Sequence, residues 1–269
     1  MTVPFENDTG NIVRKLARKS LKSEKRRNLM VVIAVALASC LICFSIVMAL
    51  STRQIEKNHV EDTYEAVYTR ITEEDVSTLK GLDDFSRVGE YYMLAVEPAE
   101  QGYNASYIYC DEETMYIARD QMKLLEGRLP QKEDEVVVSR YFLSNYGADA
   151  GIGEKVMLSS ESFHGEYTVT GIMEGYKEKE VNGSSILLSK EALKGWSGYD
   201  PADYRAYVHF KNEQQMDETE LTARSREIAK EYQLEMPIMN LSYMKFYKQP
   251  VNVSMLALVA VIAVLVIIG

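Results

Sequence analysis

A run of 22 residues without a charged side chain, residues 29–50, constrains this chain more than any other feature. As a helix that rises about 1.5 Å per residue it spans roughly 33 Å, enough for a hydrocarbon core about 30 Å thick. Twelve of its residues are Leu, Ile, Val or Phe, which favour insertion. The apolar part of a secretory signal peptide is shorter, about 7–15 residues, and a cleavage site follows it. We therefore predict an uncleaved transmembrane helix over residues 29–50.

Charge is sorted along the chain. Residues 1–50 contain eight Lys or Arg and three Asp or Glu, residues 51–250 contain 22 and 37, and residues 251–269 contain neither. Because basic flanks stay in the cytoplasm, we expect a cell-membrane protein with a cytoplasmic N-terminus and an extracytoplasmic segment 51–250. An acidic external segment repels phosphate, which excludes nucleic acid as a partner. The cations that set this orientation are Arg14, Lys15, Arg18, Lys19, Lys22, Lys25, Arg26 and Arg27.

The basic segment, residues 1–28, has a helical pattern. Apolar or small residues recur at spacings of one, three and four from Ile12 to Leu21, and the cations lie opposite them. We expect a basic amphipathic helix on the inner membrane surface, where anionic lipid attracts each well-placed cation by about 1 kcal/mol. The alternative is that the cations only set the topology.

Residues 251–269 form a second uncharged run, again with twelve Leu, Ile or Val residues. The run covers about 28 Å as a helix. Pro250 suits the first turn of such a helix, where its missing N–H costs nothing. No polar flank follows Gly269, so we expect a second span that the end of the sequence cuts short. The alternative is a C-terminal tail anchor.

The external segment mixes short strands with helices. Runs with partial apolar alternation predict strands at 87–96, 105–110, 136–138, 155–158, 167–173, 185–188 and 204–210. Helical spacing and capping residues predict helices at 72–80, 112–126, 139–146, 214–232 and from Ser189. This order predicts an α+β domain over residues 51–250, held between the two spans, with an inserted subdomain at about 126–200.

Residues 51–64 contain no Gly or Pro, so the first span can run on as a helix beyond the membrane. Such a helix would be a stiff stalk, and Gln54 and Ile55 lie within it. The alternative is that this segment only tethers the external domain.

Patterns that carry chemistry are few. His59, His164 and His209 are far apart and belong to no metal motif. The glycine cluster at 147–153 fits neither the phosphate-loop nor the dinucleotide spacing, and no acidic cluster matches a calcium loop. We therefore predict that the chain is not an enzyme and that it binds no cofactor or metal.

Five stretches, taken in order, carry a resemblance to a known family. The first is the basic approach to the first span, residues 11–28. The others are Glu126-Gly-Arg-Leu-Pro130, Asp134-Glu-Val-Val-Val-Ser139, Gly153-Glu-Lys-Val156 and Tyr167-Thr-Val-Thr-Gly-Ile172. Together they resemble the FtsX-like ABC transporter permeases of the MacB type, whose external core domain has such motifs in this order. Glu154 stands where the family more often has Asp, and residues 145–153 match its pattern loosely.

The resemblance implies a permease subunit that pairs with a separate cytoplasmic ATPase and with a second permease copy, identical or paralogous. It also implies that ATP-driven movement of the ATPase is relayed to the external domain. It does not identify the substrate or the regulated partner. A sensor is the alternative, because a receptor or sensor kinase also places an external α+β domain between two spans. An externally anchored enzyme is a third alternative, for which the catalytic residues are lacking.

Overall fold

The computed structural model describes residues 9–23, 25–98, 102, 104–119, 121–145, 150–175 and 178–248. These residues belong to two units, one made of residues 1–55 and 250–269 and the other of Glu56–Gln249. Pro250 and the second predicted span, residues 251–269, lie outside the described residues.

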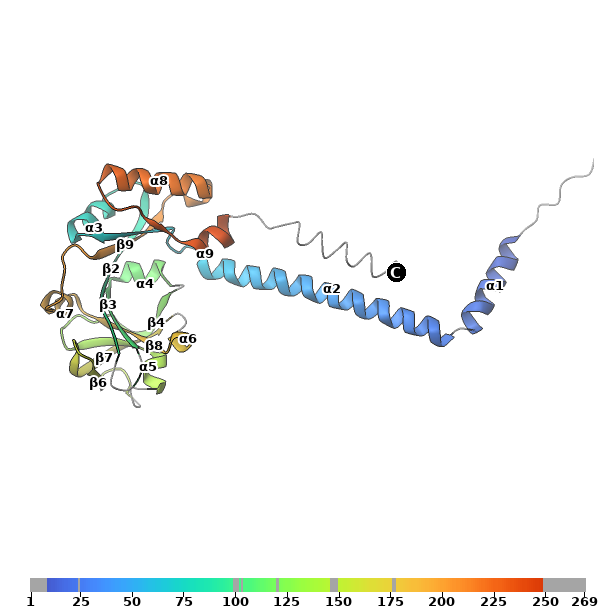
Figure 1. Cartoon of the computed structure of the whole chain (residues 1–269), viewed down its shortest axis with the longest axis horizontal. Coiled ribbons are helices and arrows are strands. Elements are labelled where there is room, and N and C mark those ends of the chain that lie inside the picture. Colours follow the sequence, from blue (N-terminus) through green and yellow to red (C-terminus); the bar gives the residue numbers. More distant parts are fainter. Residues whose placement is uncertain are drawn as a thin grey trace, which may run out of the picture. The chain divides into compact units, whose positions relative to one another are not determined.

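The first unit contains helix α1 and helix α2 up to Ile55, and the last turn of α2 belongs to the second unit (Figure 1). Helix α1 covers Thr9–Ser23 and helix α2 covers Lys25–Val60. Within the described ranges, α2 is the one helix long and apolar enough to cross a membrane, and none of its apolar stretch is buried. Ser39 and Ser45 donate their hydroxyl hydrogens to the carbonyls of Val35 and Leu41, each at 2.8 Å. Such bonds satisfy a hydroxyl in apolar surroundings.

Helix α2 ends at Val60, four residues before the end that the sequence predicts. Thr63 explains the stop, because its hydroxyl donates to the Val60 carbonyl at 2.7 Å and so competes with the helical ladder. Asp62 then adopts a left-handed conformation with φ of 54°. The helix is unbroken at Gln54 and Ile55.

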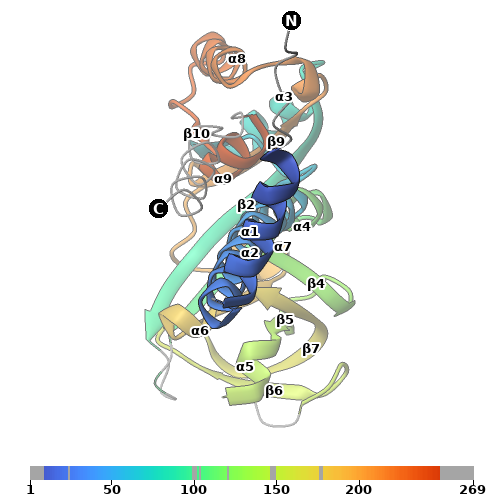
Figure 2. The same cartoon turned by 90° about the vertical axis from the view of Figure 1, so that its right-hand side faces the viewer.

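The second unit is built on one mixed sheet of ten strands (Figure 2). Its path runs β10-β1-β9-β2-β3-β8-β5-β7-β4, and β6 also pairs with β7. The strands are β1 Ala66–Ile71, β2 Phe85–Pro98, β3 Asn104–Cys110, β4 Met122–Gly127, β5 Glu135–Ser139, β6 Lys155–Ser159, β7 His164–Gly175, β8 Gly183–Leu188, β9 Tyr204–Phe210 and β10 Ile238–Met239. The predicted α+β class is confirmed.

One half of the sheet, here called the aromatic half, consists of β10, β1, β9 and β2 with helices α3 Glu73–Lys80 and α8 Glu218–Glu231. Neighbouring strands are antiparallel throughout. Its two β-α-β units interleave in the ferredoxin-like manner. Capping boxes at Thr72 and Asp217 begin the two helices, as the sequence predicts for α3.

The other half, here called the aliphatic half, consists of β8, β5, β7, β4 and β6 with short helices α5 Arg140–Asn145 and α6 Glu178–Val181. Strand β7 pairs with β5 along one edge, and with β6 and then β4 along the other. Val136, Val137 and Val138 are fully buried. Three consecutive buried residues show that β5 is covered on both faces. Strand β3 joins the two halves through its parallel pairing with β8.

The core lies on both faces of the sheet. Strand β9 alternates between them, since Tyr204, Ala206 and Val208 join one buried cluster and Tyr207 joins the other. Helices α3, α5, α8 and α7 Lys190–Gly195 contribute to the first cluster, and α4 Glu112–Ile117 contributes to the second. Short helices α9 Leu241–Tyr243 and η2 Met244–Lys248 end the described chain.

Two predicted helices are wrong in part. Residues 112–126 divide into α4 and strand β4, because residues 122–127 pair with the open edge of β7. Residues 214–232 divide into a 3-10 turn, η1 Glu213–Gln215, and α8, because Asp217 caps a new helix. The sequence analysis did not predict strands β1 and β10. The other predicted strands and helices are found with shifts of a few residues.

Candidate functional site

In the described part of the chain, no three His, Cys, Asp or Glu residues lie close enough together to hold a metal ion. His59 lies in the last turn of α2, His164 begins β7, and His209 lies in β9. Cys110 is buried and reduced, and burial raises the pKa of its thiol, which leaves it unreactive. The polar features of interest are instead two sets of ion pairs that join distant elements.

The family-like motifs meet in the aliphatic half. Arg128 forms a bidentate pair with Glu135, at 2.7 and 2.8 Å. This pair and the N–H of Gln131 lower the pKa of Glu135 to about 2. Gly127 has φ of +82°, and a Cβ there would lie 2.2 Å from the Thr170 carbonyl oxygen. The motifs therefore hold β4, β5 and β7 together.

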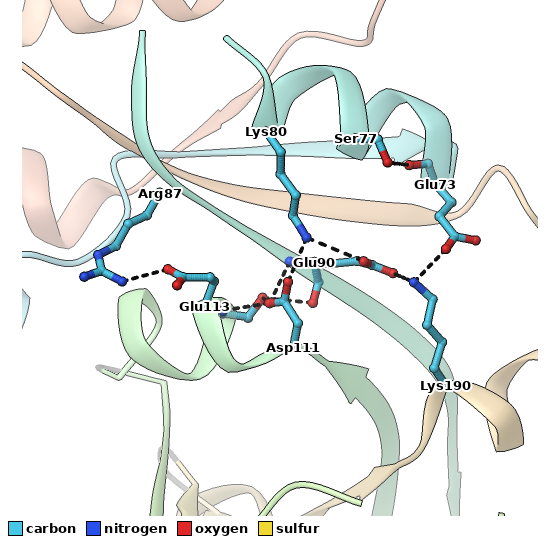
Figure 3. Close-up of polar contacts among 9 residues, drawn as sticks. Glu73, Ser77, Lys80, Arg87, Glu90, Asp111, Glu113 and Lys190 are labelled. Carbon is cyan, nitrogen blue, oxygen red and sulfur yellow. Dashed lines mark hydrogen bonds and ion pairs between the residues drawn. The ribbon is translucent and has the colours of Figure 1, made fainter. Parts of the chain in front are cut away.

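A first set of charges, the bridge cluster, consists of Glu73, Lys80, Glu90, Asp111 and Lys190 (Figure 3). The Lys190 ammonium lies 2.6 Å from Glu90 and 2.7 Å from Glu73. The Lys80 ammonium lies 3.0 Å from Asp111 and 3.7 Å from Glu90. Figure 3 shows the Glu90 carboxylate between the two lysines. The side chain of Glu90 is 8% exposed, so its charge depends on these partners.

The bridge cluster is possible because α4 packs directly on β2. Asp111 caps α4 and accepts hydrogen bonds from the N–H groups of Thr114 and Glu90, each at 2.9 Å. Gly89 permits the approach, since a Cβ there would lie 2.4 Å from the Thr114 hydroxyl oxygen. Burial lowers the pKa of Lys190, but the hydrogen bonds that its ammonium donates to Glu73 and Glu90 outweigh it, and the net pKa is raised. Helices α3, α4 and α7 are thereby fastened to β2.

A second set, the junction cluster, consists of Glu65, His209, Glu213, Asn240 and Lys248. Glu65 is fully buried just after α2 ends. Its carboxylate lies 2.7 Å from Nδ1 of His209 and accepts the Phe210 N–H at 2.7 Å. Burial raises the pKa of Glu65. Burial lowers the pKa of His209, but the hydrogen bond and charge of Glu65 outweigh it, and the net pKa is raised.

Asn240 connects the start of the second unit to its end. Its backbone N–H donates to the Glu65 carbonyl at 2.8 Å, and its side-chain amide donates to the Tyr64 carbonyl at 3.0 Å. Its side-chain oxygen caps α9 by accepting from the Tyr243 N–H at 3.1 Å. The chain that enters from α2 and the chain that leaves through η2 are therefore bonded to each other.

A groove of about 510 Å³ opens beside the junction cluster on the face that carries α4. Its walls come from the last turn of α2, from the start of α9 and from the beginning of β4, and strands β2, β3 and β8 form its floor. Asn240 belongs to both the groove and the cluster. A shift at the junction would therefore change the shape of the groove.

The predicted site residues lie in the first unit. The described cations Arg14, Lys15, Arg18, Lys19, Lys25, Arg26 and Arg27 are exposed on α1 and α2, while the side chain of Lys22 lies outside the description. Gln54 and Ile55 lie on α2, where Ile55 is 68% exposed. Their predicted roles in topology, lipid binding and the stalk remain predictions.

Sequence reasoning missed both clusters because their members are far apart along the chain. Lys190 is 100 residues from Glu90, and His209 is 144 residues from Glu65. A signal was available for Glu90, since it interrupts an apolar run that predicts a strand. Charged residues are rarely buried unless they are paired, so such an interruption indicates a partner without naming it.

The model of the MacB-like periplasmic core domain family matches residues 29–226. This chain belongs to that family. The match confirms the resemblance to FtsX-like permeases of the MacB type. The MacB-like family consists of domains of ABC transporter permeases, which are not themselves enzymes. Membership, with the apolar helix α2, indicates a membrane protein with an extracytoplasmic segment.

Solved structures of transporter and permease domains are similar to this chain at low sequence identity. The extracellular domain of the noncanonic ABC-type transporter YknZ from Gram-positive bacteria is 15% identical, with a TM-score of 0.46 over 66% of this chain and 100% of that one. The periplasmic region of MacB from Actinobacillus actinomycetemcomitans is 11% identical, with a TM-score of 0.46 over 69% and 91%. A permease domain from Porphyromonas gingivalis is 16% identical, with a TM-score of 0.45 over 72% and 96%. No curated protein matches the chain significantly.

Proposed function

We propose that this chain is the permease subunit of an ABC transporter that relays ATP-driven conformational change from a separate cytoplasmic ATPase to its own extracytoplasmic domain. The observation that carries the proposal is the continuity of α2. The apolar stretch and residues 51–60 form one helix, Lys25–Val60, which ends five residues before β1. A continuous helix transmits displacement along its axis, whereas a flexible linker absorbs it.

The remaining parts follow from charge and family. Eight cations before the span favour a cytoplasmic N-terminus, with α1 on anionic lipid and residues 51–250 outside. Residues 251–269 would return the chain to the membrane as a second span. Permease components of ABC transporters work with an ATPase, and the resemblance to the MacB type adds a second permease copy as partner.

A mechanical relay suits the chemistry of the chain better than a transport path does. Residues 29–50 contain no charged side chain, whereas polar groups within the membrane are typical of a substrate path. Membership of a permease family favours the relay over a sensor, which is the alternative function. In the relay, ATP hydrolysis takes place on the partner subunit.

The stalk can be tested by softening α2. Replacing Gln54 and Ile55 by Gly costs about 0.8–1 kcal/mol of helix propensity at each site, and Ile55 is mostly exposed. We expect the Gly-Gly variant to insert and to bind its ATPase normally, but to lose export or resistance in a complementation assay. The control is the Ala-Ala variant, which removes the same side chains and keeps the helix. Full activity of the Gly-Gly variant would reduce the stalk to a tether.

Orientation and partnership are checked in the same cells. In a cysteine-free background, a thiol at Ser160 should react with an impermeant reagent, and a thiol at Ser23 should resist it. Labelling of Ser23 alone would reverse the topology. Full-length protein should also co-purify with an ATPase, and a clean monomer without one would favour the sensor.

A further inference from the structure

The second unit begins and ends at the same place. Helix α2 delivers the chain at Val60, and η2 carries it away at Lys248. Lys57 of α2 lies over the ring of Tyr247, with its ammonium 4.9 Å from the ring centroid. The Tyr247 ring stacks on Tyr243 at 5.1 Å. The entering helix and the leaving segment are thus in direct contact.

Lys248 and Glu213 form a buried ion pair beneath this contact. Each side chain is 6% exposed, and the ammonium lies 3.4 Å from the carboxylate. The ammonium also donates to the backbone carbonyl of Glu213, and the rings of Tyr243 and Tyr247 flank it at 5.8 and 5.7 Å. A buried pair contributes little net stability, but removal of one partner leaves an uncompensated charge and is strongly destabilising. Such a pair therefore favours one arrangement of the elements that carry it.

The pair is continuous with the rest of the junction cluster. Glu213 begins η1, directly after β9, and β9 holds Glu65 through His209 and Phe210. Asn240 closes the circuit from the leaving segment back to Tyr64 and Glu65. The non-covalent links in this circuit are hydrogen bonds and one ion pair between buried or partly buried groups, and short stretches of backbone join them. Loosening one link should therefore expose the next.

We propose that Glu213 and Lys248 are positioning residues of a latch, which ties the leaving segment through η1 and β9 to the chain that follows the entering helix, so that both chain connections of the external domain move as one. The latch rests on the proposed function for its use, because it prevents movement of α2 from being absorbed by slack in the leaving segment. Whether the latch exists does not depend on the proposed function and can be tested on the structure alone. The family signature does not supply it, since Lys248 lies beyond the matched residues 29–226.

Hydrogen exchange of the full chain in lipid nanodiscs tests the latch. The variant is Lys248→Met, and the matched control is Lys245→Met, which removes the same charge from an exposed position on η2. We expect Lys248→Met to speed exchange at least about tenfold both at 240–248 and at 63–66, while β5 and β8 stay protected. The control should exchange like the wild type. If 240–248 loosens and 63–66 does not, the two connections are independent and the latch is refuted.

A double variant separates the ion pair from the penalty of a lone buried charge. Glu213→Gln with Lys248→Met removes both charges and also the hydrogen bond that Lys248 donates to the Glu213 backbone carbonyl. We expect both segments to remain loosened, but less than in Lys248→Met, because no lone buried charge is left. Wild-type protection in the double variant would show that the pair fastens nothing, and would overturn the proposal. Rescue by Lys248→Arg, which restores a cation, would support it.

The same samples distinguish failure of the latch from failure of the proposed function. Wild-type protein that shows the exchange pattern of the latch but never recruits an ATPase would refute the relay and leave the latch standing. If the protein recruits the ATPase but Lys248→Met does not change hydrogen exchange at 63–66, the latch is refuted and the relay is not.

Discussion

The two halves of the sheet bury their surface by different means. The aromatic half packs rings edge to face, with centroids 4.7 Å apart for Tyr64 and Tyr207, 4.9 Å for Phe85 and Phe210 and 5.1 Å for Tyr92 and Tyr204. The aliphatic half packs mainly branched side chains of Val, Leu and Ile on β5, β6 and β8. Tyrosine adds a polar handle to its apolar ring. The aromatic half therefore gains specific anchors that packing by shape alone does not provide.

Hydroxyl groups show this difference directly. The Tyr68 hydroxyl donates to the Ser225 carbonyl on α8 at 2.9 Å. The Tyr92 hydroxyl accepts the Asp200 N–H at 2.9 Å, in the loop before β9. Each ring both fills the core and fixes one neighbouring segment. The sequence already shows the tyrosines, but only the fold shows which segment each one fixes.

The two halves also differ in the direction in which the pKa of a buried carboxylate is shifted. Glu135 of the aliphatic half meets a bidentate Arg128, and its pKa falls to about 2. Glu65, which directly precedes β1 of the aromatic half, pairs with His209 in a more fully buried site, and burial raises its pKa. The acidic group is the same in both places, so its surroundings decide the direction of the shift.

The largest expected effect comes from Tyr68→Ala. Tyr68 is fully buried, and truncation of a buried aromatic ring costs about 3–5 kcal/mol. Thermal unfolding of the full chain in detergent should show a large drop in melting temperature. Tyr68→Phe keeps the ring and should cost only about 1 kcal/mol, the net value of one hydrogen bond.

The counterpart in the aliphatic half is Val137→Ala, which sharpens the same comparison. It removes two buried methyl groups, at about 0.8 kcal/mol each before any cavity cost, and should lower stability by about 2 kcal/mol. If Val137→Ala destabilises the chain as much as Tyr68→Ala does, the aromatic half holds no special anchors.

An intermediate effect is expected from Lys190→Met in the bridge cluster. The change leaves Glu90, which is 8% exposed, with Lys80 at 3.7 Å as its remaining cation. We expect a loss of about 2 kcal/mol, since a buried carboxylate that loses its hydrogen-bonded cation has part of its desolvation penalty left uncompensated. Lys194→Met is the control, because Lys194 also pairs with Glu73 but is 51% exposed. Exposed pairs contribute about 0–1 kcal/mol, and equal losses for the two variants would show that the bridge does not depend on burial.

The smallest effect near neutral pH is expected from the titration of buried groups. The folded pKa of His209 lies above 6.5, so its stabilising contribution is complete below 6.5 and is lost as pH rises through the folded value. The pKa of Glu65 is also raised, so its contribution to stability is likewise lost as pH rises above 4.5. Glu135 acts in the opposite direction, because its contribution is complete above 4.5 and is lost as pH falls toward about 2.

Melting temperatures across this pH range check the assignment. His209→Asn places an amide near Nδ1 without a titrating ring, and it should flatten the alkaline side of the profile. Glu135→Gln should flatten the acid side and leave the alkaline side unchanged. A profile that both variants alter alike would break the contrast between the halves.

Sequence reasoning predicted most strands and the capped helix at 72–80, because alternation and capping are local signals. It failed at 112–126, where apolar residues with helical spacing conceal a boundary. Residues 122–127 become a strand because β7 offers an open edge there, and the hydrogen bonds of such a pairing outweigh propensity differences of a few tenths of a kcal/mol per residue. It also missed both clusters, whose partners come together only in the folded chain.

By itself, the sequence determined the apolar helix, the sorting of charge, the α+β class and the family motifs. Each of these is written in neighbouring residues, as periodicity, composition or a short spacing, so no partner is needed to recognise it. Only the tertiary structure determined that Lys190 forms an ion pair with Glu90 and that Lys248 forms one with Glu213. Burial of a charge depends on which distant segments pack around it, and that choice belongs to the free energy of the whole fold.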